Sequence, residues 1–109
     1  MNYEVIAVPT FRKQLKKLFK KYHSLKADLA SLINELEKNP TYGTQLGKNC
    51  YKIRIAVTSK GKGKSGGARI ITNFVISGSV VYLLSIYDKS EKDNITDKEL
   101  IELLNDIPE

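Results

Sequence analysis

Hydrophobic residues along this chain change their spacing near residue 50, from a helical period to an alternating one. Before that point, five apolar residues mark one face of a helix: Phe11, Leu15, Leu18, Phe19 and Tyr22. A second stripe follows after a very short turn: Leu25, Leu29, Leu32, Ile33 and Leu36. Thr10 and Ser24 are predicted as N-caps, and Asn39-Pro40 ends the second helix. The pattern predicts a helical hairpin whose apolar stripes face each other.

After residue 50 the sequence predicts an antiparallel meander. Residues 51–57 alternate between large apolar side chains on one face and basic ones on the other, as in a half-buried strand. Residues 68–76 and 80–87 are predicted as the next two strands, with 58–67 as a flexible loop and 77–79 as a tight turn.

The two ends of the chain complete the expected fold. Residues 3–8 form a short β-rich run before Pro9, and Thr96 with Glu99 forms a capping box that begins a C-terminal helix. The order is β-α-α-β-β-β-α. It predicts an α+β fold in which the helical hairpin and the C-terminal helix pack on one face of a small, mainly antiparallel twisted sheet. With 109 residues, we expect one domain spanning residues 1–109.

Charge is distributed unevenly along the sequence. Residues 1–87 carry 15 basic and 4 acidic side chains, whereas residues 88–109 carry 3 basic and 8 acidic ones. A basic body with an acidic tail favours a polyanionic partner for the body. The alternative is an ordinary basic surface, which many small proteins have.

The composition excludes several kinds of site. Cys50 is the only cysteine and His23 the only histidine, so neither an internal disulfide nor a Cys/His zinc site can form. His23 is expected in a turn, facing solvent. We therefore expect no metal and no cofactor, and any catalysis must use Lys, Arg, Tyr or carboxylates. No apolar run approaches the roughly 20 residues of a membrane span, and no secretory signal is visible, so we expect no membrane partner and a cytoplasmic protein.

Basic side chains from three predicted strands share one sheet face. Alternation places Lys52 and Arg54 there from the first meander strand and Arg69 from the second. From the third strand, Leu83, Ser85, Tyr87 and Lys89 have the matching parity. Because neighbouring strands lie about 4.8 Å apart, we expect these cations and Tyr87 to be able to contact one phosphate together. The alternative is a polar strand face in water.

Two further basic regions accompany this face. Lys62 and Lys64 lie in the glycine-rich loop, where a mobile loop that binds nucleic-acid backbone is the preferred interpretation. The loop matches G-x-G-x-x-G, but a strand follows it where a dinucleotide site needs a helix. The polar face of the first helix is also rich in lysine: Lys13, Lys16, Lys17 and Lys20. These lysines either contact phosphates or form a solvated face.

Taken together, these segments resemble the RelE/ParE superfamily of type II toxin–antitoxin toxins, especially its RelE/HigB-like branch. The resemblance is carried by residues 11–18 (FRKQLKKL), 36–40 (LEKNP), 51–54 (YKIR), 62–71 (KGKSGGARII) and 82–89 (YLLSIYDK). The KSGGAR stretch is the most specific of them.

The resemblance implies a ribosome-dependent mRNA endonuclease without metal or cofactor. In such toxins the ribose 2′-OH attacks the adjacent phosphate and basic groups stabilise the developing charge. Carried onto this chain, Arg69 would be the phosphate ligand of the transition state. Lys52 and Arg54 would bind phosphate or supply a general base, and Tyr87 would stack on a base or assist proton transfer. Lys89 would replace a basic residue of the family's last strand or tail.

The resemblance also implies a partner and leaves two alternatives. The expected partners are the ribosome, mRNA and a cognate antitoxin, often of helix-turn-helix type, with operator DNA bound only through the complex. One alternative is a ParE-like inhibitor of DNA gyrase that cuts no RNA. The other is a basic nucleic-acid-binding module without catalysis.

Overall fold

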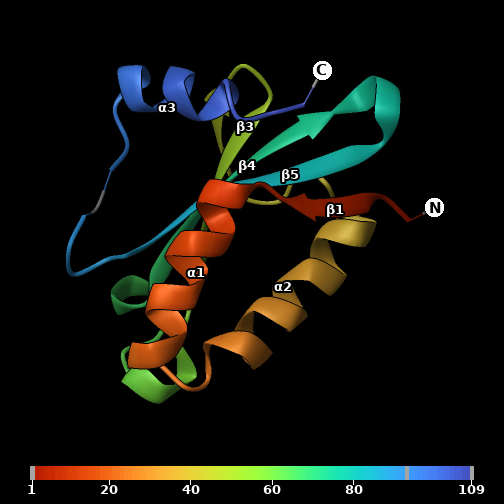
Figure 1. Cartoon of the computed structure of the whole chain (residues 1–109). Helices are drawn as coiled ribbons and strands as arrows, with labels where there is room; N and C mark the ends of the chain where they lie inside the picture. The colour runs from red at the N-terminus through yellow and green to blue at the C-terminus, as the bar shows by residue number, and fades with distance from the viewer. Residues whose placement is uncertain (1, 93, 109) are drawn as a thin grey trace.

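The computed structural model describes residues 2–92 and 94–108 and shows three helices packed on a five-stranded sheet (Figure 1). The elements are β1 (Glu4–Ala7), α1 (Pro9–Lys21), α2 (Leu25–Lys38), β2 (Thr44–Gly47), β3 (Cys50–Ile55), β4 (Ala68–Val75), β5 (Val80–Asp88) and α3 (Asp97–Leu104). Short 3-10 turns lie at η1 (Thr58–Lys60), η2 (Lys64–Gly66) and η3 (Ile76–Gly78). The α+β class predicted from the sequence is confirmed.

The strand order is β1-β5-β4-β3-β2, with β1 parallel to β5 and every other neighbouring pair antiparallel. The predicted meander therefore forms the centre of the sheet. The sequence did not predict β2, which pairs with β3 through Thr44 and Lys52 at the outer edge.

The helical hairpin covers one face of this sheet (Figure 1). Phe11 from α1 and Leu25 and Leu36 from α2 are fully buried, together with Ile53 and Ile70 from the strands. The two predicted stripes thus supply the core. Truncating Phe11 to alanine would cost about 3–5 kcal/mol, the usual range for a buried phenylalanine.

The helix ends agree only in part with the expected caps. Thr10 is not an N-cap, because Pro9 occupies the first turn and Val8 precedes it without a side-chain cap. Proline suits this position since its missing N–H would have no partner there. Ser24 does precede α2, but its hydroxyl bonds to Asp28 instead of capping the backbone. The capping box of Thr96 is confirmed at the start of α3.

A β-bulge corrects the expected alternation on β5. Ile71 pairs with Ser85 and Thr72 with Leu83, so Leu84 is the extra residue. Because of the extra residue, side chains on β5 before the bulge point to the opposite sheet face from the one that strict alternation predicts. Leu83 therefore does not lie on the face of Ser85, as the sequence predicted, but on the hairpin side, where it is buried.

The C-terminal helix packs on the opposite face from the hairpin, so the prediction of all helices on one face is wrong. Asp88 points to the hairpin side, where it contacts Tyr22. Ser85 lies on the other face by alternation, and it lines a cavity together with Glu99 and Leu103 of α3. Gln14 of α1 reaches the same cavity from the edge of the sheet, where its Oε1 accepts from the backbone N–H of Ile86. In the part of the chain that the structure describes, no helix is long and apolar enough to cross a membrane.

Candidate functional site

Three of the predicted site residues occupy one row across the sheet. Arg54 on β3 pairs with Arg69 on β4, and Arg69 pairs in turn with Tyr87 on β5. Neighbouring strands are about 4.8 Å apart, so the three Cα positions lie within reach of one phosphodiester. Lys52 begins the adjacent row on the same face, opposite Ile71. The register agrees with the prediction that these positions share one sheet face.

Arg69 itself is buried, contrary to its expected exposure on an open face. Only 2% of it is accessible. Its Nη1 donates to the carbonyl oxygens of Lys64 at 2.9 Å and Ala68 at 3.2 Å, and its Nη2 donates to that of Ser65 at 3.4 Å. Its Nε is buried with no hydrogen-bond partner among the described residues. Backbone oxygens of the β3–β4 loop thus surround the guanidinium.

Two of the other three cations of the predicted site, Lys52 and Arg54, point away from Arg69. Lys52 donates to Asn94 Oδ1 at 3.1 Å. Arg54 lines two adjoining cavities of about 280 and 540 Å³, which it shares with Tyr42 and Lys64. The structure therefore brings the positions together, but these side chains do not surround one open phosphate-sized cleft in this conformation.

Tyr87 is the β5 member of the row and lies next to the segment that leads to α3. Lys92 Nζ is 5.5 Å from the centre of its ring. Lys92 also forms an ion pair with Glu99, and this contact together with the backbone N–H of Thr96 lowers the pKa of Glu99 to about 2. Lys89 directly follows β5, and its backbone N–H donates to Gly67 at 3.1 Å.

Asp88 organises the other side of the site and was missed by sequence reasoning. It accepts hydrogen bonds from Tyr22 at 2.5 Å, Lys60 at 2.7 Å, and the amide and hydroxyl of Ser90 at 2.9 and 2.8 Å. Burial by itself would raise the pKa of Asp88, but these donors outweigh it and hold the pKa well below 3.8. Lys60 also donates to Gly67 at 3.4 Å, so the pair fixes both ends of the β3–β4 loop. A lone carboxylate at the end of an otherwise uncharged strand could have drawn attention to it.

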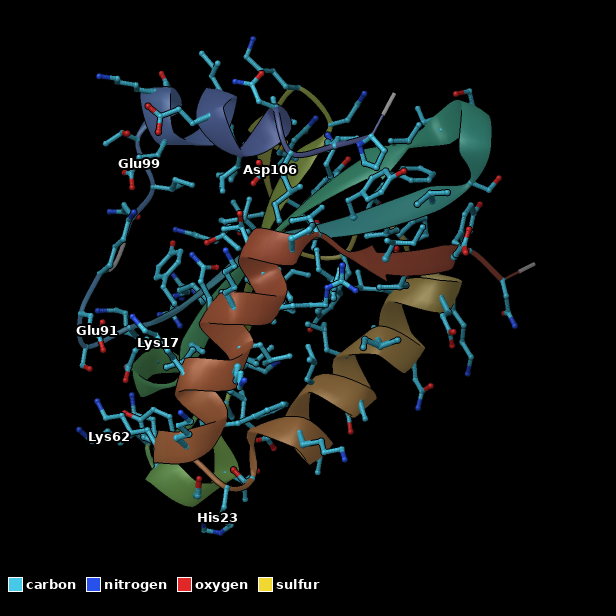
Figure 2. The ribbon with its side chains drawn as sticks, viewed as in Figure 1. Lys17, His23, Lys62, Glu91, Glu99 and Asp106 are labelled. Atoms are coloured by element: carbon cyan, nitrogen blue, oxygen red, sulfur yellow. The ribbon has the colours of Figure 1, made fainter. Side chains whose placement is uncertain are left out.

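Exposed lysines surround the row. Lys62 and Lys64 are exposed on the β3–β4 loop, and Lys13, Lys16, Lys17 and Lys20 are exposed on α1. Lys17 shares a cavity of about 290 Å³ with Tyr87, which connects the lysine-rich helix to the row. Figure 2 shows Lys17 and Lys62 toward the end of the molecule where His23 extends into solvent, as expected for His23. Glu99 on α3 and Asp106, which follows α3, lie toward the other end.

Other candidate chemistries have little support in the described residues. Over residues 2–92 and 94–108, no cluster of three His, Cys, Asp or Glu side chains is arranged to hold a metal ion. Cys50 is buried, and burial raises the pKa of its thiol, so the thiol is a poor nucleophile.

Comparison with known proteins identifies the fold and the family. Residues 10–106 match the family model described as the RelE toxin of the RelE/RelB toxin–antitoxin system. The chain belongs to the RelE toxin family. The match spans most of the sequence, including the basic row, the β3–β4 loop and α3.

Solved structures of E. coli RelE share the fold. Free RelE with two arginines replaced by alanine is 17% identical, with a TM-score of 0.60, and the match covers 97% of this chain and 94% of that one. The same variant bound to a RelB antitoxin peptide is 18% identical, with a TM-score of 0.62 and coverage of 99% and 100%. RelE in the intact RelBE complex is 19% identical, with a TM-score of 0.60 and coverage of 79% and 95%.

Proposed function

We propose that this RelE-family chain is a ribosome-dependent endoribonuclease that cuts mRNA and thereby stops translation. The observation that carries the proposal is the cross-strand row of Arg54, Arg69 and Tyr87, with Lys52 in the next row. Cationic side chains that converge from these neighbouring positions would repel each other, and an anion bound between them would remove that repulsion. A phosphodiester is such an anion, and the planar guanidinium of arginine can bind it through two parallel N–H donors.

The proposed reaction needs no group beyond the protein and the RNA. The ribose 2′-oxygen attacks the adjacent phosphorus, and the bond from phosphorus to the 5′-oxygen breaks. The products are a 2′,3′-cyclic phosphate and a 5′-OH. Arg69 and Arg54 stabilise the charge that develops on the phosphate, which is usually a large term in such catalysis. Lys52 binds phosphate or accepts the 2′-OH proton, and Tyr87 stacks on a base or transfers a proton. Lys89 supplies a further cation.

The surrounding lysines would bind the ribosome and the RNA backbone. Those on α1, together with Lys62 and Lys64, form the exposed basic surface next to the row. We assign them to phosphate contacts, which give salt-sensitive affinity.

The proposal includes a cognate antitoxin and a cytoplasmic site of action. RelE of E. coli is known in complex with RelB and with a RelB peptide. A protein antitoxin, of helix-turn-helix type in our proposal, would obstruct the basic face and bind operator DNA as a complex. Ribosomes and mRNA are the targets, so the proposed location is the cytoplasm.

Purified ribosomes programmed with a defined mRNA provide the test. The wild-type protein should generate 5′-OH ends in the ribosome-bound mRNA, and Arg54→Ala should lower the cleavage rate about 100-fold, the usual loss when one charge-stabilising donor is removed. Arg54 is exposed, so this substitution should leave folding intact, whereas Arg69 is buried. Arg12→Ala on α1 is the matched control and should cut at the wild-type rate.

The same protein induced in bacteria separates the remaining possibilities. Early loss of protein synthesis with cut mRNA supports the nuclease. Early loss of DNA synthesis with intact mRNA would contradict it and indicate a gyrase inhibitor. An unaffected culture would contradict it in favour of a plain nucleic-acid-binding module.

A further inference from the structure

The backbone of the β3–β4 loop binds part of the Arg69 guanidinium and covers the rest of it. Lys64 and Ser65 both accept hydrogen bonds from the guanidinium, and Arg69 is 98% buried beneath them. An arginine normally binds phosphate through two parallel N–H donors. The edge formed by Nε and Nη2 keeps free donors, since Nε has no partner among the described residues, but it is buried, so a phosphate can reach it only when the covering segment moves.

The loop is fixed at both ends and solvent-exposed between them. Lys60 is held by Asp88 at one end. At the other end, Gly67 lies so close to β3 that an added Cβ would be 1.9 Å from the carbonyl oxygen of Ile55. In residues 61–66, by contrast, all but the last are exposed. A segment with few buried contacts opens at low cost while its ends stay in place.

We propose that residues 61–66 form a lid that closes over a phosphodiester-binding site at Arg69. This proposal rests on the proposed function, because it names how that site becomes accessible. In the closed lid, the carbonyls of Lys64 and Ser65 substitute for phosphate oxygens. Opening exposes the guanidinium, including the buried Nε without a partner, beside Arg54 and Tyr87.

The charges on the lid explain why RNA would favour the open state. Lys62 and Lys64 are part of the lid and are exposed. An RNA backbone attracts both lysines and offers Arg69 a ligand that the closed state excludes. RNA therefore binds the open state better than the closed one, which is the condition for a ligand to shift such an equilibrium.

Gly63 allows the closed lid to be destabilised without disturbing a contact. Its φ of +64° and ψ of −165° lie in a region that is essentially restricted to glycine. A Cβ added there meets no atom within 4 Å, so Gly63→Ala introduces backbone strain and no clash. Gly47→Ala is the matched control, because Gly47 has a φ of +92°, is equally unhindered and lies at the end of β2, outside the β3–β4 loop.

An arginine-directed reagent measures the lid without any RNA. The chain has three arginines, Arg12, Arg54 and Arg69, and peptide mass spectrometry reports phenylglyoxal modification of each. In the wild-type protein Arg69 should react at least about tenfold more slowly than Arg12, since it is covered. Gly63→Ala should increase the rate of Arg69 modification about tenfold, as expected from the strain in the closed state. The rate of Arg12 modification should not change. Gly47→Ala should leave all three rates unchanged.

Two results would overturn the lid. One is an Arg69 rate that Gly63→Ala does not change in a protein with a native circular-dichroism spectrum, because Arg69 would then be a structural clamp for the loop. The second result concerns protection of Arg69 by RNA. The probe is a short RNA whose scissile ribose is 2′-deoxy, so that it cannot be cut. This RNA should slow Arg69 modification in Gly63→Ala, and failure to protect would show that the uncovered group binds no phosphodiester.

These outcomes are distinguishable from failure of the proposed function. The modification rates need neither ribosomes nor cleavage. Suppose that Arg69 becomes reactive in Gly63→Ala and is protected by the uncut RNA, but ribosome-bound mRNA stays intact. The lid proposal would then stand, and the proposal of nuclease activity would be contradicted.

Discussion

Lys60 Nζ lies 2.7 Å from Asp88 Oδ1, and the two side chains are 7% and 0% exposed. They meet where the loop after β3 returns to the end of β5. Without Lys60, the cation left near Asp88 is Lys21, which is 3.7 Å away and 55% exposed. Loss of the buried partner of a buried charge costs more than loss of a surface pair. This contact is therefore expected to be the most sensitive electrostatic interaction in the fold.

Replacing Lys60 by methionine tests that expectation. Lys60→Met should lower the free energy of unfolding by about 3 kcal/mol, measured by urea denaturation at pH 7. Lys62→Met, two residues along the same loop, is the control and should change it by less than about 0.5 kcal/mol because Lys62 is exposed. Equal losses of unfolding free energy in the two variants would show that the Lys60–Asp88 pair makes no specific contribution to stability.

Stability should also fall in acid because of Asp88. Its pKa is lowered in the folded protein, so the carboxylate stabilises the fold fully above its unfolded pKa of about 3.9 and progressively less as the pH falls below that value. Urea unfolding between pH 6 and pH 2 should show this decline. Asp88→Asn should make the decline shallower without abolishing it, because Glu99 also has a lowered pKa, of about 2. If the dependence of unfolding free energy on pH were the same in Asp88→Asn as in the wild-type protein, Asp88 would not be a source of the acid sensitivity.

The sequence predicted the elements that depend on local pattern. The apolar spacing of α1 and α2, the alternation along β3 and the capping box at Thr96 are properties of neighbouring residues, and each appears where expected. β2 was missed because its four residues are mostly exposed and show no alternating apolar pattern. Its strand state depends on pairing with β3, which no local signal reports.

The candidate site was predicted in its positions and not in its environment. Alternation placed Arg54, Arg69 and Tyr87 on one sheet face, and the observed register shows that they also lie in one row. The burial of Arg69 depends on how the glycine-rich loop folds back over it, and the parity of Leu83 depends on a bulge at Leu84. Both are tertiary features that residue spacing does not encode.

The start of α3 offers a local test of what covers the second sheet face. The Thr96 side chain accepts from the Glu99 amide at 3.1 Å, and the Glu99 carboxylate accepts from the Thr96 amide at 3.0 Å. Thr96→Ala should cost about 1 kcal/mol and increase hydrogen exchange in the first turn of α3. Thr41→Ala, at an exposed threonine outside the helices, should leave exchange in α3 unchanged. Unaltered protection of α3 in Thr96→Ala would show that packing of Leu100 alone fixes the helix.

The lysines of α1 give a prediction that separates phosphate contact from a solvated helix face. Replacing Lys13, Lys16, Lys17 and Lys20 together by glutamine removes four positive charges. If all four contact phosphates, the slope of log affinity against log salt for ribosome binding should become shallower by about 3. Sedimentation with purified ribosomes at several salt concentrations measures this slope.

A second quadruple variant with the same charge distinguishes local contact from net charge. Lys26, Lys38, Lys48 and Lys98 are also exposed and lie on α2, the β2–β3 turn and α3. Replacing them by glutamine lowers the net charge equally, yet it should change the slope by less than about 1 if the α1 face is the contact surface. Equal changes in the two variants would mean that ribosome affinity follows overall charge, and α1 would then be an ordinary solvated face. Because the cavity shared by Lys17 and Tyr87 joins α1 to the row, loss of ribosome affinity confined to the α1 variant would connect binding and the candidate cleavage site on one continuous surface.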